Sequence, residues 1–167
     1  PAMPRTAGDP GIPFGELTAF IEQDQTLKGT PADPPDAVSR AIARHAAPFI
    51  GDGATLQTGL SKVPDAVLDA LHDRRNLRLH TGLAGDGALR LVRSGAMAAG
   101  ASALVGVAIG SPELYDGLND PHFQFRPVSV THDLRVAGAA EHFVTVNSAL
   151  EIDLFGQVYS EVGPKGA

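Results

Sequence analysis

The run ALVGVAI at residues 103–109 constrains the fold more than any other part of the chain. Each of its residues is apolar or glycine, so a strand built from it is apolar on both faces, which is typical of a buried strand in a parallel sheet. Shorter strand-like segments at residues 54–58, 77–79, 123–128 and 143–146 alternate with segments of helical spacing. This alternation predicts an α/β fold with an open, mostly parallel sheet flanked by helices.

The chain is predicted to divide into an arm and a domain. Residues 1–35 are rich in proline, glycine and aspartate and end in a Pro-Pro pair, which favours an extended arm and linker with one short strand at residues 17–21. The domain is expected at residues 36–167, a length that suffices for a hydrophobic core. Because the chain begins with Pro1 and not with methionine, we expect it to be an excised or processed part of a longer protein.

A helix is predicted over residues 36–49, opening the domain. Its apolar and aromatic positions follow helical spacing and predict one buried stripe, with a histidine on or beside it. The stripe consists of Val38, Ala41, Ile42, His45 and Phe49. A further helix is expected from Pro64, because proline is tolerated in the first turn of a helix.

Composition excludes several functional classes. A net charge of −6, a pI near 5.4 and the absence of tryptophan argue against a nucleic-acid partner, which requires clustered basic residues or stacking platforms. No apolar run approaches the ~20 residues of a membrane helix, and no signal peptide is visible, so no membrane partner is expected. The absence of cysteine excludes thiolate chemistry, and a cytoplasmic location is the default expectation. The six histidines form no metal-binding motif, and no phosphate-loop motif occurs, so neither a metal nor a bound nucleotide is expected.

The glycine-rich segment at residues 80–87 is the principal candidate for a functional loop. It joins the predicted strand at residues 77–79 to a predicted helix at residues 88–93. It carries His80, Thr81 and Asp86 among three glycines that permit close backbone approach. In parallel sheets such loops border the ligand crevice. From local sequence alone, both a functional loop and a plain strand-to-helix connection remain open.

Four segments resemble the acetyl-CoA hydrolase/transferase family, which includes the 4-hydroxybutyrate CoA-transferases. Residues 52–67, DGATLQTGLSKVPDAV, resemble the family pattern D-G-A-T-L-Q-x-G-I-G-x-I-P-D-A-V. Residues 80–87 are similar to H-T-E-x-x-x-D-G, and residues 147–158 to N-S-A-L-x-V-D-L-x-G-Q-V. The arm, with MPRT at residues 3–6, looks like the segment that links the two family domains. The resemblance covers essentially the whole chain and implies a NagB/RpiA/CoA-transferase-like fold that packs against a related N-terminal domain.

The resemblance also implies a site and a chemistry. In the family, a glutamate attacks an acyl-CoA thioester and then carries CoA as an enzyme thioester, which is nucleophilic catalysis by a carboxylate. Asn147 would donate to the developing oxyanion. No cofactor is implied, and the thioester of coenzyme A or of phosphopantetheine would be the substrate. The implied substrate-binding residues are Gly59, Leu60, Ser61, Lys62, Thr81, Gly82, Ser148 and Gln157.

The sequence departs from the family pattern at important points. The family glutamate falls on Gly82, which has no side chain, and the second glycine of G-I-G falls on Ser61. The chain also ends before a later glycine-rich family loop and lacks the N-terminal domain. One hypothesis is an enzyme with altered acyl chemistry, in which His80 and Asp86 are the acid–base groups and Asn147 the oxyanion donor. The alternative is a degenerate half that scaffolds or regulates a partner.

Other arrangements remain open at this stage. Ser61 and Lys62 are adjacent and offer a nucleophile with a base, whereas Glu151 and Asp153 lie two apart and form either a carboxylate pair or a turn. Expected partners are the acyl-thioester substrate, an N-terminal half, and a second copy of the chain. The second copy is expected because the face that normally meets the N-terminal domain would carry apolar arm residues.

Overall fold

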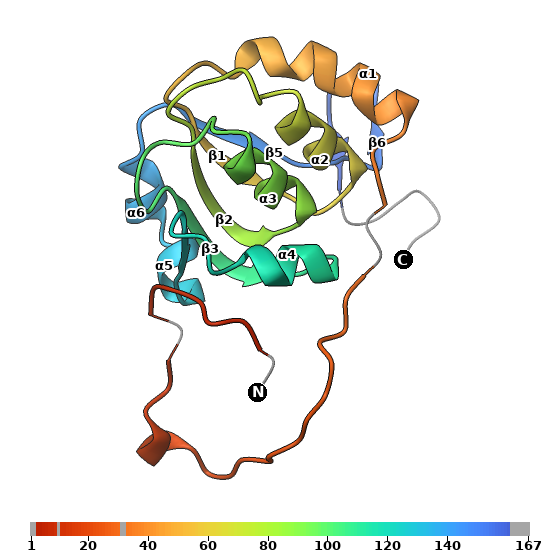
Figure 1. Ribbon diagram of the computed structural model, residues 1–167. Coiled ribbons are helices and arrows are strands. Elements are labelled where there is room, and N and C mark those ends of the chain that lie inside the picture. Colours follow the sequence, from red (N-terminus) through yellow and green to blue (C-terminus); the bar gives the residue numbers. More distant parts are fainter. Residues whose placement is uncertain (1–2, 10, 31–32, 161–167) are drawn as a thin grey trace.

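The computed structural model describes residues 3–9, 11–30 and 33–160. Five parallel strands form one sheet in the order β4-β3-β2-β1-β5, which confirms the predicted α/β class (Figure 1). These strands are β1 (Thr55–Thr58), β2 (Arg78–Ala84), β3 (Ala103–Ala108), β4 (Phe123–Phe125) and β5 (Phe143–Val146). A separate antiparallel hairpin follows, formed by β6 (Glu151–Ile152) and β7 (Val158–Tyr159).

Helices connect the strands and cover the sheet. In Figure 1, α2 and α3 lie in front of the sheet and α1 lies above them; α1 packs against α2, and α4 packs against α3. The helices are α1 (Ala37–Ala46), α2 (Lys62–Asp69), α3 (Asp86–Arg93), α4 (Pro112–Gly117), α5 (Val128–Thr131) and α6 (Leu134–Gly138). Two 3-10 turns, η1 (Phe14–Glu16) and η2 (Ala47–Phe49), complete the described elements. No described helix has the length and hydropathy needed to cross a membrane.

The core lies between the sheet and the α1–α3 layer. Leu56 of β1, Leu71 after α2 and Phe123 of β4 are all 0% exposed, and Val67 and Leu68 of α2 are buried against them. Burial of each such side chain stabilises the fold by about 1.5–3 kcal/mol before the cost of ordering the chain. The predicted helix near Pro64 begins slightly earlier, at Lys62.

The predicted stripe of the first helix is wrong. Val38 is 69% and Phe49 is 85% exposed, whereas Ala43 and Ala47 are buried. Small side chains on this face allow α1 to approach the domain closely, and Arg74 Nε donates to the carbonyl oxygen of Ile50 just beyond it. Close approach therefore determines the buried face of α1, and the larger apolar residues point outward.

Two strand predictions also need correction. The segment at residues 17–21 has no strand; it follows η1 in an otherwise irregular arm. The strand predicted at residues 77–79 continues to Ala84, so most of the predicted loop at residues 80–87 lies inside β2. Its central residues pair with β3, as in the register Thr81↔Val105 and Leu83↔Val107. Apolar and small residues at 82–84 permit this extension, and Gly85 then caps α3.

The arm is attached to the domain at two separated points. Asp9 N donates to the carbonyl oxygen of Phe125 at 2.9 Å, and Thr30 N donates to that of Gly110 at 3.0 Å. Between them the arm extends away from the domain in Figure 1. The division into an arm at residues 1–35 and a domain at residues 36–167 stays a prediction.

Candidate functional site

The topology reverses between β1 and β5. Strands β1 to β4 follow one another toward one edge of the sheet, whereas β5 lies on the other side of β1. In open α/β sheets, ligands bind beyond the carboxyl ends of the strands at such a reversal. Gly59, which follows β1, donates its N–H to the carbonyl oxygen of Val146 at the end of β5, at 2.9 Å. The loops that follow the two strands therefore begin side by side.

Asn147 lies directly against Gly59. A Cβ atom on Gly59 would stand 2.8 Å from Asn147 Oδ1, so the close approach requires glycine. Asn147 Nδ2 donates to Gln57 Oε1 at 2.9 Å, which fixes the orientation of the amide. An amide nitrogen carries two hydrogens, so one donor of Asn147 is left beyond this bond.

Two serines extend the same site. Ser61 Oγ, at the start of α2, and Ser148 Oγ, after β5, are 2.5 Å apart. Lys62 Nζ instead forms an ion pair with Asp33 of the arm, at 3.0 Å. The predicted binding residues Gly59, Ser61 and Ser148 thus meet at one place, together with Asn147. The hypothetical Ser61–Lys62 nucleophile and base have different partners.

Thr81, in the middle of β2, bonds to the carboxyl end of β1. The two strands pair at Leu56↔Leu79, and further along Thr81 Oγ1 donates to the carbonyl oxygen of Thr58 at 2.9 Å. Thr81 is fully buried. Its hydroxyl therefore satisfies a backbone acceptor beyond the last residues that pair β1 with β2. Thr81 and Asn147 both border the carboxyl end of β1.

Gly82 lies against a histidine that the sequence analysis did not select. A Cβ atom on Gly82 would stand 2.7 Å from Cε1 and 3.1 Å from Nε2 of His132, which follows α5. The only local signal for His132 was its place in the polar run Thr131-His132-Asp133. That run carries no spacing that connects it to residue 82.

His80 is buried and has a structural partner. Its side chain is 6% exposed, and Nε2 donates to the carbonyl oxygen of Thr131 at 2.9 Å. The ring also stands edge-on to Phe143, with centroids 6.0 Å apart. This geometry ties β2 to α5, and the role of His80 in acid–base catalysis stays a prediction.

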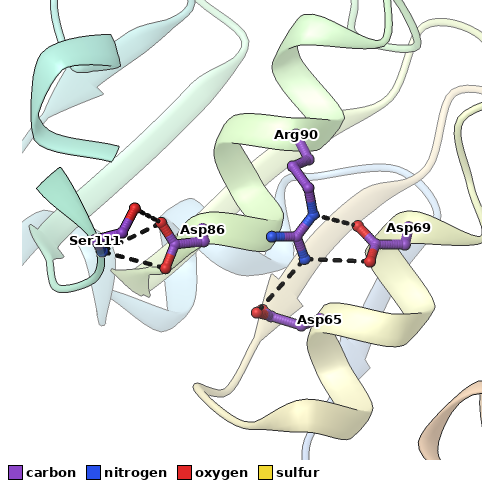
Figure 2. A network of polar contacts seen from close by, with 5 residues as sticks. All are labelled: Asp65, Asp69, Asp86, Arg90 and Ser111. Carbon is purple, nitrogen blue, oxygen red and sulfur yellow. Dashed lines mark hydrogen bonds and ion pairs between the residues drawn. The ribbon is translucent and has the colours of Figure 1, made fainter. Parts of the chain in front are cut away.

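Asp86 also has structural partners. Its carboxylate accepts from Ser111 N at 3.2 Å and from Ser111 Oγ at 2.6 Å (Figure 2). Ser111 caps α4, since its Oγ accepts from Leu114 N. Asp86 thereby connects the start of α3 to the start of α4, and no described contact joins it to His80 or Asn147. Its predicted catalytic role also remains untested.

A second group of charges lies beside Asp86. Arg90 Nε donates to Asp69 Oδ1 at 2.7 Å, and Arg90 lies 3.7 Å from Asp65 Oδ2 (Figure 2). Burial raises the pKa of the Asp65 carboxyl, and the Arg90 guanidinium opposes that rise only in part. These contacts hold α2 against α3. Among the described residues, no histidine and carboxylate groups cluster closely enough to hold a metal ion.

The remaining predicted residues lie at the margins of this site. The Leu60 side chain reaches the backbone of Gly85, where a Cβ would meet it at 2.5 Å. Gln157 lies in the hairpin turn, and its N–H donates to Asp153 Oδ1 at 2.9 Å. Asp153 thus acts in a turn, and Glu151, two residues earlier, is exposed. No described contact connects Gln157 to Asn147.

Comparisons with known proteins identify relatives of this chain. Residues 110–166 match the model of the acetyl-CoA hydrolase/transferase C-terminal domain. The chain is 33% identical over 166 residues to the 4-hydroxybutyrate coenzyme A transferase of Clostridium kluyveri, covering 95% of this chain. It is 32% identical to the succinyl-CoA:cyclohexane-1-carboxylate CoA transferase of Geobacter metallireducens, over 96% of this chain.

Solved structures give the same relationship. The structure of RipA from Yersinia pestis superposes with a TM-score of 0.86 at 30% identity and covers 95% of this chain. A 4-hydroxybutyrate CoA-transferase from Porphyromonas gingivalis superposes with a TM-score of 0.84 at 34% identity and covers 93% of this chain. The chain spans only 39% and 41% of these two structures, and 39% of the Clostridium kluyveri relative.

Proposed function

We propose, from the premise that this chain belongs to the acetyl-CoA hydrolase/transferase family, that it binds an acyl thioester of coenzyme A or phosphopantetheine at the carboxyl ends of β1 and β5. The observation that carries the proposal is the contact between Gly59 and Asn147, with Ser61 and Ser148 beside it. Backbone groups, hydroxyls and a fixed amide at a topological reversal suit a polar, uncharged thioester carbonyl.

In this proposal Asn147 supplies an oxyanion donor. Addition to a thioester carbonyl places negative charge on its oxygen, and a preorganised N–H lowers the energy of that state. The bond to Gln57 holds the amide before substrate arrives, so little reorganisation is needed. Loss of one oxyanion donor typically lowers kcat by about 10²–10³-fold.

The acyl chemistry proposed here proceeds without a glutamyl intermediate. By resemblance, the family nucleophile corresponds to Gly82, and a glycine supplies no carboxylate. The imidazole of His132 stands beside the position that a side chain would occupy. The reaction class is therefore transfer, hydrolysis or another conversion of the acyl group by direct attack of an acceptor.

The proposal includes protein partners. The relatives are longer than this chain, and an N-terminal half would supply the remainder of the cleft. Exposed apolar side chains on the arm, among them Phe14 and Phe20, offer a surface for such a half or for a second copy of the chain.

The binding claim is tested by titrating acetyl-CoA into the chain by calorimetry. Gly59→Val would push side-chain atoms into Asn147, so we expect at least a tenfold weaker affinity. Gly51→Ala is the matched control at the other end of the same strand, where a Cβ meets nothing within 4 Å. Equal affinity in the wild type and in Gly59→Val would refute this location.

The mechanistic claim is tested by trapping. The chain is incubated with radiolabelled acetyl-CoA and a carboxylate acceptor, then treated with borohydride or hydroxylamine. We expect no stoichiometric enzyme-bound acyl or CoA adduct, because residue 82 has no carboxylate. Recovery of such an adduct would show that another carboxylate acts as nucleophile, and the direct-attack proposal would be wrong.

A further inference from the structure

Two glycines on neighbouring strands leave one small area of the sheet without side chains. Gly82 of β2 and Gly106 of β3 lie side by side, between the registered pairs Thr81↔Val105 and Leu83↔Val107. A Cβ on Gly106 would stand 2.8 Å from the carbonyl oxygen of Gly82 and 3.4 Å from Thr131 Oγ1. The end of α5 occupies the space that side chains at these positions would fill.

Hydrogen bonds fix the position of the His132 imidazole over this area. His132 Nδ1 lies 2.9 Å from Thr131 Oγ1, and the His132 N–H donates to the carbonyl oxygen of Val128 at 3.0 Å. Thr131 is itself buried, and its carbonyl oxygen accepts from His80 Nε2. The side chain of His132 is exposed, so its outer edge reaches solvent beside Gly82. This series of contacts orients one imidazole beside Gly82, in the second half of β2.

We propose that His132 is a general base that activates water for attack on the acyl thioester, an inference that rests on the function proposed above. In this scheme Nδ1–H donates to Thr131 Oγ1, and this tautomer leaves a lone pair on Nε2, the ring nitrogen that lies beside Gly82. A nucleophile or base held by a third group is the usual arrangement for such chemistry. Thr131 and His80 are positioning residues in this scheme.

The step balances without any further reagent. Nε2 takes a proton from water while the water oxygen forms a bond to the thioester carbonyl carbon, giving a tetrahedral oxyanion. The C–S bond then breaks, and the imidazolium returns the proton to the leaving thiolate. The products are a carboxylic acid and a free thiol, so the predicted activity is thioester hydrolysis.

His132 suits this role better than the groups selected from sequence. The Nε2 atom of His80 is committed to a carbonyl oxygen, and His80 is buried. The Asp86 carboxylate accepts from both the backbone N–H and the hydroxyl of Ser111. His132 is exposed, and its imidazole lies against Gly82.

The test measures acetyl-CoA binding and hydrolysis by the full chain. Substitution His132→Ala is expected to lower kcat by about 100-fold, the low end of general-base effects, with KM changed less than about twofold. Added imidazole is expected to restore part of kcat in this variant, which a purely structural role would not allow. His132→Gln, which retains a polar side chain but no base, covers the case in which the alanine variant does not fold.

The control is His45→Ala on the exposed face of α1, which should hydrolyse at the wild-type rate. Unchanged kcat in both His132 variants, with acetyl-CoA still bound, would overturn the role of His132 and leave the proposed function standing. Binding without any hydrolysis by the wild type would overturn it equally. Absence of acetyl-CoA binding to the wild type would remove the proposed function and this inference with it.

Discussion

At the scale of single residues, glycine positions decide which chemistry this fold can hold. Gly59 allows Asn147 to approach the end of β1, and Gly82 with Gly106 allows α5 to place an imidazole on the sheet. In each case the absence of a Cβ is what creates the contact. A glycine in a strand interior costs roughly 0.5–1 kcal/mol relative to alanine, so Gly82 and Gly106 lower the stability of their strands while they permit this close approach.

Gly82→Ala and Gly106→Ala distinguish a contact with a movable side chain from a contact with backbone atoms. At residue 82 the added Cβ meets the end of an exposed ring that can swing away, so we expect stability within about 1 kcal/mol of wild type. Hydrolysis should nevertheless fall at least tenfold, because the imidazole is displaced. At residue 106 the Cβ meets backbone, so unfolding in urea should show a loss of about 1–3 kcal/mol. Full activity in Gly82→Ala would contradict the placement of His132.

The raised pKa of the Asp65 carboxyl predicts that one component of the stability depends on pH. Burial raises its pKa in the folded state, so the folded protein binds this proton more tightly than the unfolded chain does. The contribution of Asp65 to stability is therefore fully present below the ordinary value of 3.8 and is lost as the pH rises through the raised pKa.

Asp65→Asn has no charge to bury and should remove this fall. The measurement is the free energy of unfolding against pH for wild type and variant, with exposed Asp24→Asn as control. The free energy of unfolding of the wild type minus that of Asp65→Asn should fall as the pH rises. A rise of this difference with pH would contradict the predicted sign.

At the scale of elements, α1 shows how packing overrides side-chain size. Its buried face consists of small residues because α1 lies close to α2, and Arg74 donates from the adjoining loop to the end of this segment. Small side chains permit short distances between helices, whereas the larger apolar residues of α1 remain outside. The result is an outward apolar surface made of Val38, Ile42 and Phe49.

Substitutions on the two faces of α1 should behave oppositely. Val38→Ala removes an exposed side chain and should change the free energy of unfolding by no more than about 0.5 kcal/mol. Ala43→Leu adds atoms to a site that is 1% exposed and should cost about 1–3 kcal/mol. Thermal or urea unfolding distinguishes them. A large loss in Val38→Ala would mean that this face is covered in solution.

At the scale of the whole molecule, the most prominent feature is exposed apolar surface on the arm and on the hairpin. Phe14, Phe20 and Ile21 are 72%, 66% and 87% exposed, and Phe155 of the hairpin is 91% exposed. Phe14 and Phe20 contact each other, with ring centroids 5.4 Å apart, but not the domain core. Soluble monomers rarely leave such surface open to water, so a partner is expected to cover it.

Light scattering at micromolar concentration should therefore detect a dimer of the isolated chain. A symmetric pair would bury the same arm surface on both copies. Phe14→Ser with Phe20→Ser should shift the population toward monomer without changing the stability of the domain, because neither ring belongs to the core. A wild-type monomer with an exposed arm would instead indicate that a different polypeptide covers this surface.

The amino-acid sequence by itself determined the fold class and the family. Alternation of apolar runs with helical spacing is a local property, and it was sufficient for the parallel sheet and for the existence of α2. The DGATLQTG motif and the absence of a carboxylate at Gly82 were also readable directly. Each of these features depends only on residues close together along the chain.

Only the tertiary structure decided which side chains meet. Gly82 and His132 are far apart in sequence, and their contact depends on strand register and on how α5 packs against β2 and β3. Likewise, the glycines at 82 and 85 suggested a loop, but pairing with β3 supplied partners for the backbone and kept residues 80–84 extended. The outward face of α1 has the same origin: periodicity fixes which residues share a face, whereas the packing distance to neighbouring elements fixes which face is buried.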